Sequence, residues 1–319
     1  MHYSKLGLKN TQEIFHKAIQ NGFAVPAFNI YNLETMIAVL NAAKTNKSPV
    51  ILGISESALN YMGANNLIGL ISAQKFSSDD YVCLHLDHGK SFDLCKHVIE
   101  LGFSSVMIDA SALPLHENIS ISSYVAEYAH KFDVSTESEI GILSGIEDEN
   151  TFSDKSQYTN PQDAKTFVEN TNTDSLAVAI GTSHGAYKRK NKDENLRFDI
   201  LEKIEQKIPN TPIVLHGAST IPEKFVNTIN KFGGKINNAI GIDALQLKFA
   251  ATKTNICKIN IDSDLRLAMT ASIRQDLYEH PENFNPRQYL SNTIDNMSNY
   301  CAFLMREIMF SANQIKTTK

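Results

Sequence analysis

Three histidines stand directly after apolar, strand-like runs of this chain. They are His88 in LHLDHG, His184 in GTSHGA and His216 in VLHGAS. Each one alone is most simply a hydrogen-bonded histidine at the end of a strand. Three imidazoles at equivalent positions on three strands, however, form the donor set of a catalytic zinc site with one coordination position left open. The sequence therefore predicts that His88, His184 and His216 bind Zn²⁺, whereas His85 lies inside its strand and is assigned to the core or to a supporting role.

Two carboxylates follow other strand-like runs. Asp109 ends VMID, and Glu139 lies in STESEIG. They can orient the histidines, bind a second metal ion, or pair with Lys or Arg, and the sequence leaves these three alternatives open. Glu137 lies two residues before Glu139, and therefore on the same face of a strand. It is a weaker candidate for any of these roles.

The segment VLHGASTIPEKF predicts a strand, a tight glycine turn and a helix. A capping box of Thr220 with Glu223 and a proline in the first turn would open that helix. Backbone amides in the turn would then face an anion, with the helix dipole behind them. These amides belong to Gly217, Ala218 and Ser219.

A second turn of the same kind follows the last strand-like run, in KINIDSDLRLAM. Asp262 or Ser263 is expected to cap the helix that follows. Phosphate sites after the last two strands are frequent in (β/α)8 barrels. The two turns together predict phosphate binding close to His216.

Short apolar runs alternate with helical patterns along the whole chain, which favours a parallel sheet. Every run ends in a polar or ionisable residue, and in a barrel all these ends meet at one rim. We therefore expect an α/β fold, a single (β/α)8 TIM barrel over residues 1–319 with extra C-terminal helices. The expected strands are Phe23–Phe28, Val50–Gly53, Val82–Leu86, Ser105–Ile108, Val134–Ile140, Ser175–Ile180, Ile213–Leu215 and Ile256–Ile259. Helices are expected at Leu33–Asn46, Phe92–Leu101, Ser122–Lys131, Pro161–Glu169 and Pro222–Lys231.

The composition is that of a globular protein with a sizeable core: 319 residues, of which 42% are hydrophobic and 20% charged. The net charge is -5, whereas proteins that bind nucleic acid usually carry an excess of positive charge, so we expect no nucleic-acid partner. The four cysteines have no CxxC spacing and are interpreted as reduced thiols of a cytoplasmic protein. The polar start of the chain predicts no signal peptide. No apolar run is long enough for a transmembrane helix, so we expect no membrane partner.

The chain resembles the class II, zinc-dependent fructose-bisphosphate aldolases, in the branch that also contains tagatose-bisphosphate aldolases. The resemblance covers nearly the whole chain. Its most specific segments are LDHG, GTSHG, HGAS and the pattern N-x-D-[ST]-D-x-R, in that order. It implies a lyase that cleaves fructose 1,6-bisphosphate reversibly, with sugar phosphates as partners and a dimer or tetramer as the assembly.

The resemblance also implies roles for individual residues. Asp87 matches the acid/base residue beside the substrate hydroxyl, and Glu147 matches a carboxylate on a mobile loop. His88, His184 and His216 match the zinc ligands. Asp109 and Glu139 match a second divalent-metal site, and a monovalent cation is also compatible with the family. The substrate-binding positions are Asn29, Ser55, Gly185, Lys188, Gly217, Ala218, Ser219, Lys258, Asn260, Ile261, Asp262, Ser263 and Arg266, with Lys258 and Arg266 at the second phosphate.

One departure concerns the loop that carries Glu147. Many relatives have a Gly-Gly pair before its acidic residues, and this chain has Ser144-Gly145. The departure leaves the chemistry intact but bears on the mobility of the loop and on the role of Glu147.

Three other kinds of protein would share part of this residue set with a zinc aldolase. A zinc hydrolase would favour an H-x-H pair after the first strand, where Asn29 stands. A Schiff-base aldolase would need a buried lysine at a strand end, for which Lys258 is the nearest candidate. A non-catalytic sugar-phosphate binding protein would not need three histidines and Asp87. Between the epimeric substrates, LDHG followed by Lys90 favours fructose over tagatose bisphosphate by resemblance alone.

Overall fold

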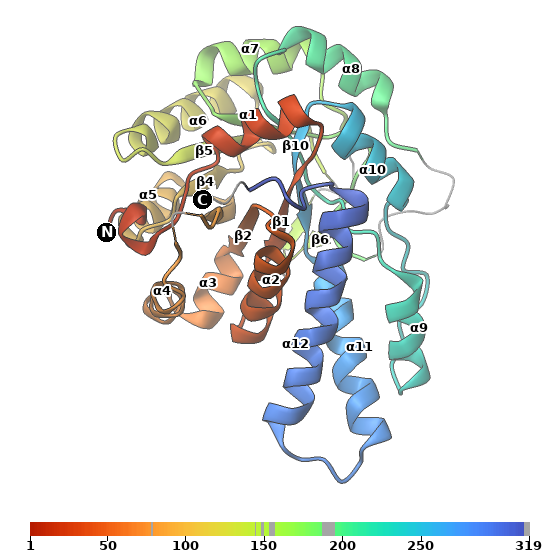
Figure 1. Ribbon diagram of the computed structural model, residues 1–319. Coiled ribbons are helices and arrows are strands. Elements are labelled where there is room, and N and C mark those ends of the chain that lie inside the picture. Colours follow the sequence, from red (N-terminus) through yellow and green to blue (C-terminus); the bar gives the residue numbers. More distant parts are fainter. Residues whose placement is uncertain (78, 144, 148–149, 153–156, 187–194, 316–319) are drawn as a thin grey trace.

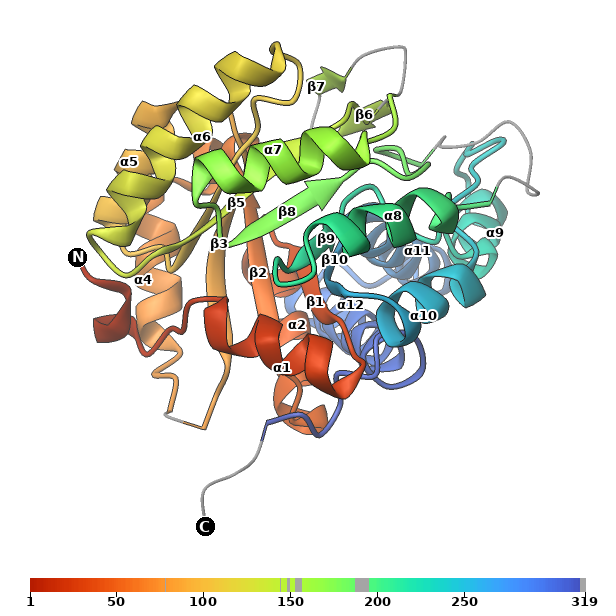
Figure 2. The same ribbon diagram turned by 90° about the horizontal axis from the view of Figure 1, so that it is seen from above.

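The computed structural model describes residues 1–77, 79–143, 145–147, 150–152, 157–186 and 195–315. Its centre is a closed barrel in which the parallel strands follow the order β1-β10-β9-β8-β5-β4-β3-β2 (Figures 1 and 2). The barrel strands are β1 (Val25–Asn29), β2 (Val50–Ser55), β3 (Val82–Gly89), β4 (Ser105–Ile108), β5 (Ser135–Ile140), β8 (Ser175–Val178), β9 (Ile213–Leu215) and β10 (Ile256–Ile261). This arrangement confirms the predicted (β/α)8 barrel, and each strand lies where the sequence predicts one, with ends that differ by up to three residues.

Helices cover the outside of the barrel (Figure 2). They are α1 (Gln12–Asn21), α2 (Leu33–Asn46), α3 (Glu56–Met62), α4 (Ala64–Ala73), α5 (Phe92–Leu101), α6 (Leu115–His130), α7 (Pro161–Thr171), α8 (Phe198–Lys207), α9 (Glu223–Lys231) and α10 (Ala244–Lys253). A short 3₁₀ helix, Tyr3–Leu6, precedes them. Because helices cover their outer faces, the strands are buried on both sides, and strands such as β2 and β4 are nearly continuous apolar runs. β5, with the sequence STESEI, is buried but mostly polar.

Local signals in the sequence set several helix ends. The side chain of Asn32 accepts a hydrogen bond from the Thr35 amide and forms a capping box at the start of α2. Ser91 caps α5 in the same way, and Gly102 ends α5 in the left-handed conformation. Both helices have the predicted bounds. The helix predicted at Ser122–Lys131 in fact begins earlier, at Leu115, after a proline.

Helix α1 packs against the amino-terminal ends of barrel strands. Ile14 and Phe15 of α1 belong to one buried cluster with Val25, Cys83 and Cys257. This apolar layer separates the interior of the barrel from solvent at the amino-terminal ends of the strands. The barrel interior therefore opens toward the carboxyl ends of the strands.

The predicted extra C-terminal helices are present. α11 (Ser263–Glu279) and α12 (Pro286–Phe303) form an antiparallel pair that extends away from the barrel (Figure 1). A five-residue π-helical turn, Leu304–Ile308, follows α12. A small antiparallel hairpin of β6 (Gly145–Glu147) and β7 (Asn150–Phe152) stands apart from the barrel. Within the described residues, no helix has the length and apolarity needed to cross a membrane.

Candidate active site

The three histidines come together at the carboxyl ends of the barrel strands. His88 lies in β3, His184 follows β8 and His216 directly follows β9. The ring centroid of His88 is 4.9 Å from that of His184 and 4.6 Å from that of His216. The pairing of β3 with β4 shifts register between Leu86 and Gly89, and His88 has a φ of 48°. Such a left-handed conformation at a residue other than glycine is common at functional sites.

A carboxylate contacts one ring nitrogen of each of two histidines. Nδ1 of His88 is 2.8 Å from Oδ2 of Asp109, and Nε2 of His216 is 2.6 Å from Oε1 of Glu137. A metal-ligating histidine usually has such a partner on its second ring nitrogen. The remaining nitrogens, Nε2 of His88 and Nδ1 of His216, are therefore the atoms through which these two residues would bind a metal ion.

Two groups of donor atoms are close enough for a metal ion. Asp87, His88 and His216 form one group, and His88, Asp109 and Glu139 form the other, with donor atoms within 4.8 Å of one another in each. His184 belongs to neither group in the described part of the chain, although its ring is within 4.9 Å of His88. Mixed imidazole and carboxylate donors suit a divalent transition metal, so the residues present fit the metal that the sequence predicts.

The two strand-end carboxylates differ in their environments. Burial alone would raise the pKa of Asp109, but its hydrogen bonds and the charge of His88 hold it well below its usual value. The pKa of Glu139 is raised, by burial first and then by the nearby charge of Asp109. The sequence leaves three roles open for Asp109: orienting a histidine, binding a second metal ion, or pairing with Lys or Arg. The contact that the structure shows is with a histidine, His88. Oε2 of Glu139 is 3.8 Å from Nδ1 of His88.

Two amide side chains hold the carboxylate of Asp87 from across the barrel. Nδ2 of Asn29 in β1 donates to one oxygen at 2.8 Å, and Nδ2 of Asn260 in β10 donates to the other at 3.0 Å. Asp87 is 2% exposed. The Oδ1 atoms of both asparagines are buried and have no hydrogen-bond partner among the described residues. The two residues predicted to contact substrate thus also orient the predicted acid/base residue.

The two predicted phosphate turns lie side by side. The Asp262 amide donates to Oγ of Ser219 at 3.3 Å, which joins the turn after β10 to the turn after β9. Gly217 has a φ of 60°, and a Cβ there would lie 2.7 Å from the carbonyl oxygen of Ser183. Only glycine fits this position, and Gly185, with a φ of 82°, shares its left-handed conformation. Ala218, Ile261 and Ser263 are buried in or beside the same turns.

The predicted capping box of α9 is wrong, and the predicted cap of α11 is confirmed in its position but not in its hydrogen bond. α9 begins at Glu223, and the preceding Pro222 has no side chain that could cap it. Thr220 instead donates to Oδ2 of Asp264 at 2.9 Å, because α11 brings that carboxylate under the turn. Asp262 occupies the N-cap position of α11 without a capping bond, and its Oδ1 accepts from Nε of Arg266 at 2.9 Å.

The predicted contact of Lys258 with the second phosphate does not agree with the structure. Its side chain is 0% exposed and points into the barrel, where Nζ contacts both carboxylate oxygens of Glu137, at 2.9 and 2.7 Å. The Lys258–Glu137 ion pair is buried inside the barrel, deeper than the carboxyl ends of the strands. A phosphate bound at those ends therefore does not contact Lys258. His85, as expected, has a supporting position, with Nδ1 2.8 Å from Oγ of Ser105 and Nε2 3.1 Å from Nζ of Lys258.

The remaining predicted residues are placed as follows. Arg266 is half-exposed, and its guanidinium lies 5.5 Å from the ring centroid of Tyr31. Ser55 ends β2 and caps α3 by accepting from the Ala58 amide at 3.2 Å. The backbone of Glu147 pairs with Asn150 in the β6–β7 hairpin, but its side chain lies outside the described residues, as does the whole of Lys188.

Glu137 and Asp264 are the two residues that sequence reasoning undervalued. Glu137 contacts both His216 and Lys258. Its signal was the alternation STESEI, which places Glu137 and Glu139 on one face of β5. Asp264 had no comparable signal, since a second aspartate in a helix's first turn is ordinary.

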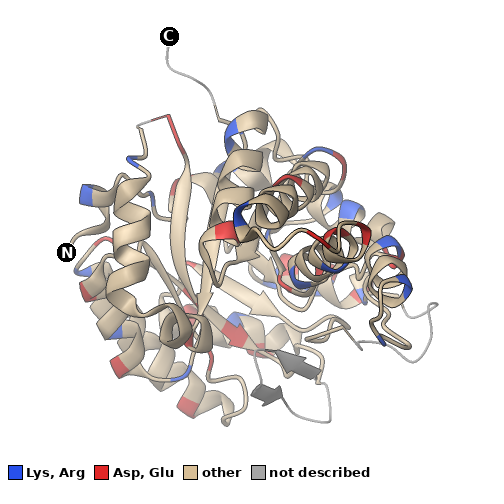
Figure 3. Cartoon of the chain, turned by 90° about the horizontal axis from the view of Figure 1, so that it is seen from below, with Lys and Arg blue, Asp and Glu red and all other residues tan. Residues whose placement is uncertain are grey.

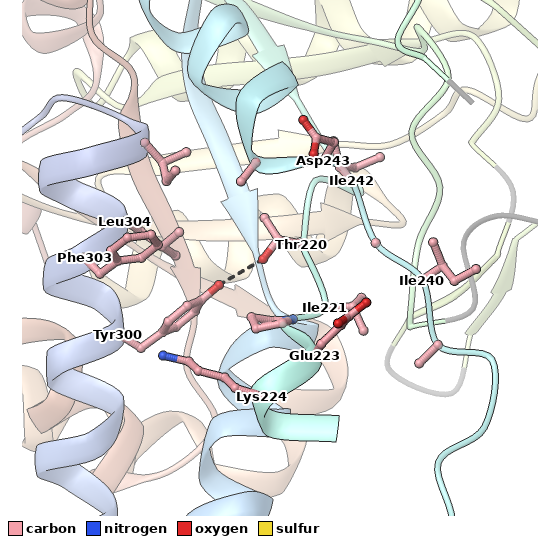
Figure 4. A pocket seen from close by; sticks show the side chains of 15 residues that line it. Thr220, Ile221, Glu223, Lys224, Ile240, Ile242, Asp243, Tyr300, Phe303 and Leu304 are labelled. Atoms are coloured by element: carbon pink, nitrogen blue, oxygen red, sulfur yellow. Dashed lines mark hydrogen bonds between the residues drawn. The ribbon is translucent and has the colours of Figure 1, made fainter. Parts of the chain in front are cut away.

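A pocket of about 480 Å³ is lined by residues from the turn after β9, from the segment before α10 and from α12 (Figure 4). Thr220, Ile221 and Lys224 line it on one side, and Tyr300 and Phe303 of α12 on the other. The hydroxyl groups of Thr220 and Tyr300, both lining residues, are 3.1 Å apart (Figure 4). The pocket contains none of the candidate metal ligands, so we do not assign the chemistry to it.

Comparisons with known proteins identify the family of this chain. The family model described as fructose-bisphosphate aldolase class-II matches residues 9–314. A fructose-bisphosphate aldolase of Treponema pallidum is 44% identical over 330 residues, covering 98% of this chain and 99% of that protein. One from Giardia intestinalis is 45% identical and covers 88% of this chain and 86% of that protein. The crystal structure of the YdjI aldolase from Escherichia coli K12 matches with a TM-score of 0.76 at 25% identity, over 97% of this chain and 100% of that chain.

Proposed function

Because the chain belongs to the class II fructose-bisphosphate aldolase family, we propose that its histidine cluster is the site at which fructose 1,6-bisphosphate is cleaved. The chain is an aldolase, a lyase that works through a divalent metal ion. The products of the reversible cleavage are dihydroxyacetone phosphate and glyceraldehyde 3-phosphate. The names of the relatives favour the fructose epimer, and tagatose bisphosphate is not the preferred alternative.

The observation that carries this proposal is the convergence of the rings of His88, His184 and His216, with the oriented carboxylate of Asp87 beside His88 and His216. We propose that the three histidines hold Zn²⁺. A bound zinc ion polarises the ketone of the substrate and stabilises the negative charge that develops during cleavage. Burial lowers the pKa of His216, which keeps its imidazole in the neutral form that binds metals.

Asp87 is proposed to move the proton of the substrate's C4 hydroxyl. It removes this proton during cleavage and returns it during condensation. The amides of Asn29 and Asn260 hold both carboxylate oxygens, so the group needs no reorientation when substrate binds. Their Oδ1 atoms remain available to accept hydrogen bonds from substrate hydroxyls.

The two turns after β9 and β10 are proposed to bind the phosphate of the dihydroxyacetone half. The proposed contacts come from Gly217, Ala218 and Ser219 after β9, from Asn260, Ile261, Asp262 and Ser263 at the end of β10 and the start of α11, and from Gly185 in the loop after β8. Arg266 is proposed to bind the second phosphate, because its half-exposed guanidinium lies at the start of α11. Ser55 and Lys188 complete the proposed substrate contacts. Glu147 is proposed to carry the carbon-bound proton of dihydroxyacetone phosphate.

Several wider expectations belong to the same proposal. A second divalent ion would be held by the carboxylates of Asp109 and Glu139, which belong to the second group of close donor atoms. We further propose a monovalent cation, a homo-oligomer, and one domain over residues 1–319. A cytoplasmic location agrees with the four free, buried cysteines. Nucleic acid is not proposed as a partner, since Lys and Arg are interspersed with Asp and Glu over the described helices (Figure 3).

A coupled assay that follows triose phosphate release tests the proposal directly. The zinc-loaded protein should cleave fructose 1,6-bisphosphate with a kcat/KM at least about tenfold above that for the tagatose epimer. Release of inorganic phosphate without triose phosphate would instead indicate a metal-dependent hydrolase. Binding of both bisphosphates without turnover would indicate a sugar-phosphate binding protein.

A further inference from the structure

A buried ion pair lies directly beneath one of the candidate metal ligands. Glu137 of β5 contacts Nζ of Lys258 in β10 with both carboxylate oxygens, and its Oε1 is 2.6 Å from Nε2 of His216. The side chains of all three residues are at most 2% exposed. β5 and β10 are not neighbours in the barrel, so this chain of contacts crosses its interior.

A buried ion pair of this kind is not explained by stability alone. Removing two charges from water costs several kcal/mol per ion before their mutual attraction is counted, and an apolar replacement is often as stable. Met107 of β4, Ala177 of β8 and Val214 of β9 form a buried apolar cluster in the same barrel. An apolar layer is therefore compatible with this barrel, and the pair is not needed to fill space.

The direction of the hydrogen bond to His216 supplies a reason. An ionised carboxylate only accepts hydrogen bonds, so Nε2 of His216 must carry the hydrogen. In the neutral ring, Nδ1 then carries the lone pair. This atom is 3.8 Å from Oδ1 of Asp87, and Asp87, His88 and His216 form a group whose donor atoms lie within 4.8 Å of one another.

We propose that Glu137 and Lys258 are positioning residues for the metal site, with Lys258 holding Glu137 as the acceptor that fixes the ring of His216. Glu137 selects the tautomer whose lone pair points toward the other ligands and keeps the ring from rotating. Lys258 offsets the cost of keeping that carboxylate out of water. The inference rests on the proposed function, since it assigns the pair a role in metal binding.

A pair of double variants separates positioning from simple structural support. Glu137→Gln with Lys258→Met removes both charges but keeps an oxygen that can accept from Nε2. Glu137→Met with Lys258→Met removes the acceptor as well. Both leave an uncharged interior of similar volume, so their metal-free melting temperatures should be similar. Zinc affinity, measured by competition with a chelator, is the readout.

We expect the protein with Glu137→Met and Lys258→Met to bind zinc about 10–100-fold more weakly than the wild type. This range is typical for loss of a group that orients a metal ligand. The Gln/Met variant should retain most of the affinity because its oxygen still fixes the ring. Equal, wild-type affinity in both double variants would overturn the inference and leave a structural ion pair. An equally large loss in both would also overturn it, since the acceptor would then make no difference.

A measurement on the unaltered protein covers the case in which a variant does not fold. Nitrogen-15 NMR of the metal-free protein, with His216 assigned by comparison with His216→Gln, should show Nε2 protonated and Nδ1 bare. A proton on Nδ1 would contradict the inference. Failure of the proposed function can be distinguished from failure of this inference. If the proposed function is wrong, the wild-type protein itself binds no zinc or releases no triose phosphate.

Discussion

The carboxylate of Asp264 accepts a hydrogen bond from the backbone amide of Ile221 at 2.8 Å, at a point where Ile221 has a φ of 51°. A β-branched residue rarely adopts this left-handed conformation, and it persists only where the surroundings hold it. The second oxygen of Asp264 accepts from the Thr220 amide at 3.0 Å and from the Tyr300 hydroxyl at 2.6 Å. A fully buried side chain of α11 therefore fixes the backbone immediately after the proposed phosphate turn.

Replacing Asp264 with asparagine should disturb that turn. An amide side chain has one acceptor oxygen, so at least one of the two backbone amides loses its partner. Hydrogen bonds to a charged group contribute about 1.5–3 kcal/mol, so we expect a lower melting temperature and a KM for the bisphosphate raised about tenfold. Zinc content should be unchanged, because no candidate ligand contacts Asp264.

Tyr300→Phe is the matched control for this change. It removes one hydrogen bond from the same carboxylate but leaves both backbone amides paired. Its effect on KM should be smaller than that of Asp264→Asn. If Asp264→Asn lowered the melting temperature and left KM unchanged, the phosphate turn would not depend on this contact.

Gly217→Ala tests the turn itself. The added Cβ would lie 2.7 Å from the backbone oxygen of Ser183, and the φ of 60° strains any side chain. We expect a loss of stability of about 1–3 kcal/mol and a raised KM. Gly69→Ala is the control, since a Cβ there meets nothing within 4 Å in the middle of α4. That change should stabilise the protein by about 0.5–1 kcal/mol and leave KM unaltered.

The metal dependence is tested by removing ligands one at a time. His88→Ala, His184→Ala and His216→Ala should each lose most of the activity and most of the bound zinc, because three protein ligands leave none to spare. A chelator should inactivate the wild type, and zinc should restore it. Borohydride added with substrate should have no effect, because Lys258 pairs with Glu137. Covalent trapping of a lysine would contradict the metal mechanism.

Asp87 and Glu147 should separate the two proton transfers. Asp87→Ala should keep the exchange of the carbon-bound proton of dihydroxyacetone phosphate with solvent and lose cleavage, because the C4 hydroxyl then has no base. Glu147→Ala should lose both activities with zinc content and fold intact, as expected if its loop closes over bound substrate. Wild-type exchange in Glu147→Ala would mean that the carbon base is another group at the rim.

Arg266→Ala tests the second phosphate. A guanidinium can form two parallel hydrogen bonds to a phosphate, so its loss should raise the KM for the bisphosphate about tenfold or more while sparing zinc content. Arg266→Lys keeps the positive charge but cannot form two parallel hydrogen bonds. Its KM should lie between those of the wild type and Arg266→Ala. Unchanged KM and kcat in Arg266→Ala would reassign Arg266 to a structural ion pair with Asp262.

The strand and helix pattern and the residues at the strand ends were predictable from the sequence. In a parallel barrel most strands are apolar runs, and the residue at the carboxyl end of each strand lies at the common rim. His88, His184 and His216 could therefore be placed together without knowledge of the contacts between them. The helix bounds of α2 and α5 were equally predictable, because their caps are side chains within a few residues of the ends.

The roles of Lys258, Glu137 and Thr220 were decided only by the tertiary structure. Whether a lysine in a strand reaches a phosphate depends on how deep it lies in the barrel, and Lys258 lies two residues before the level of Asn260, against a carboxylate 121 positions earlier in the chain. Thr220 has the spacing of a capping box but donates to Asp264, 44 residues away. Local spacing describes the partners available along the chain, whereas a buried polar group bonds whichever partner the packing of distant strands and helices brings within reach.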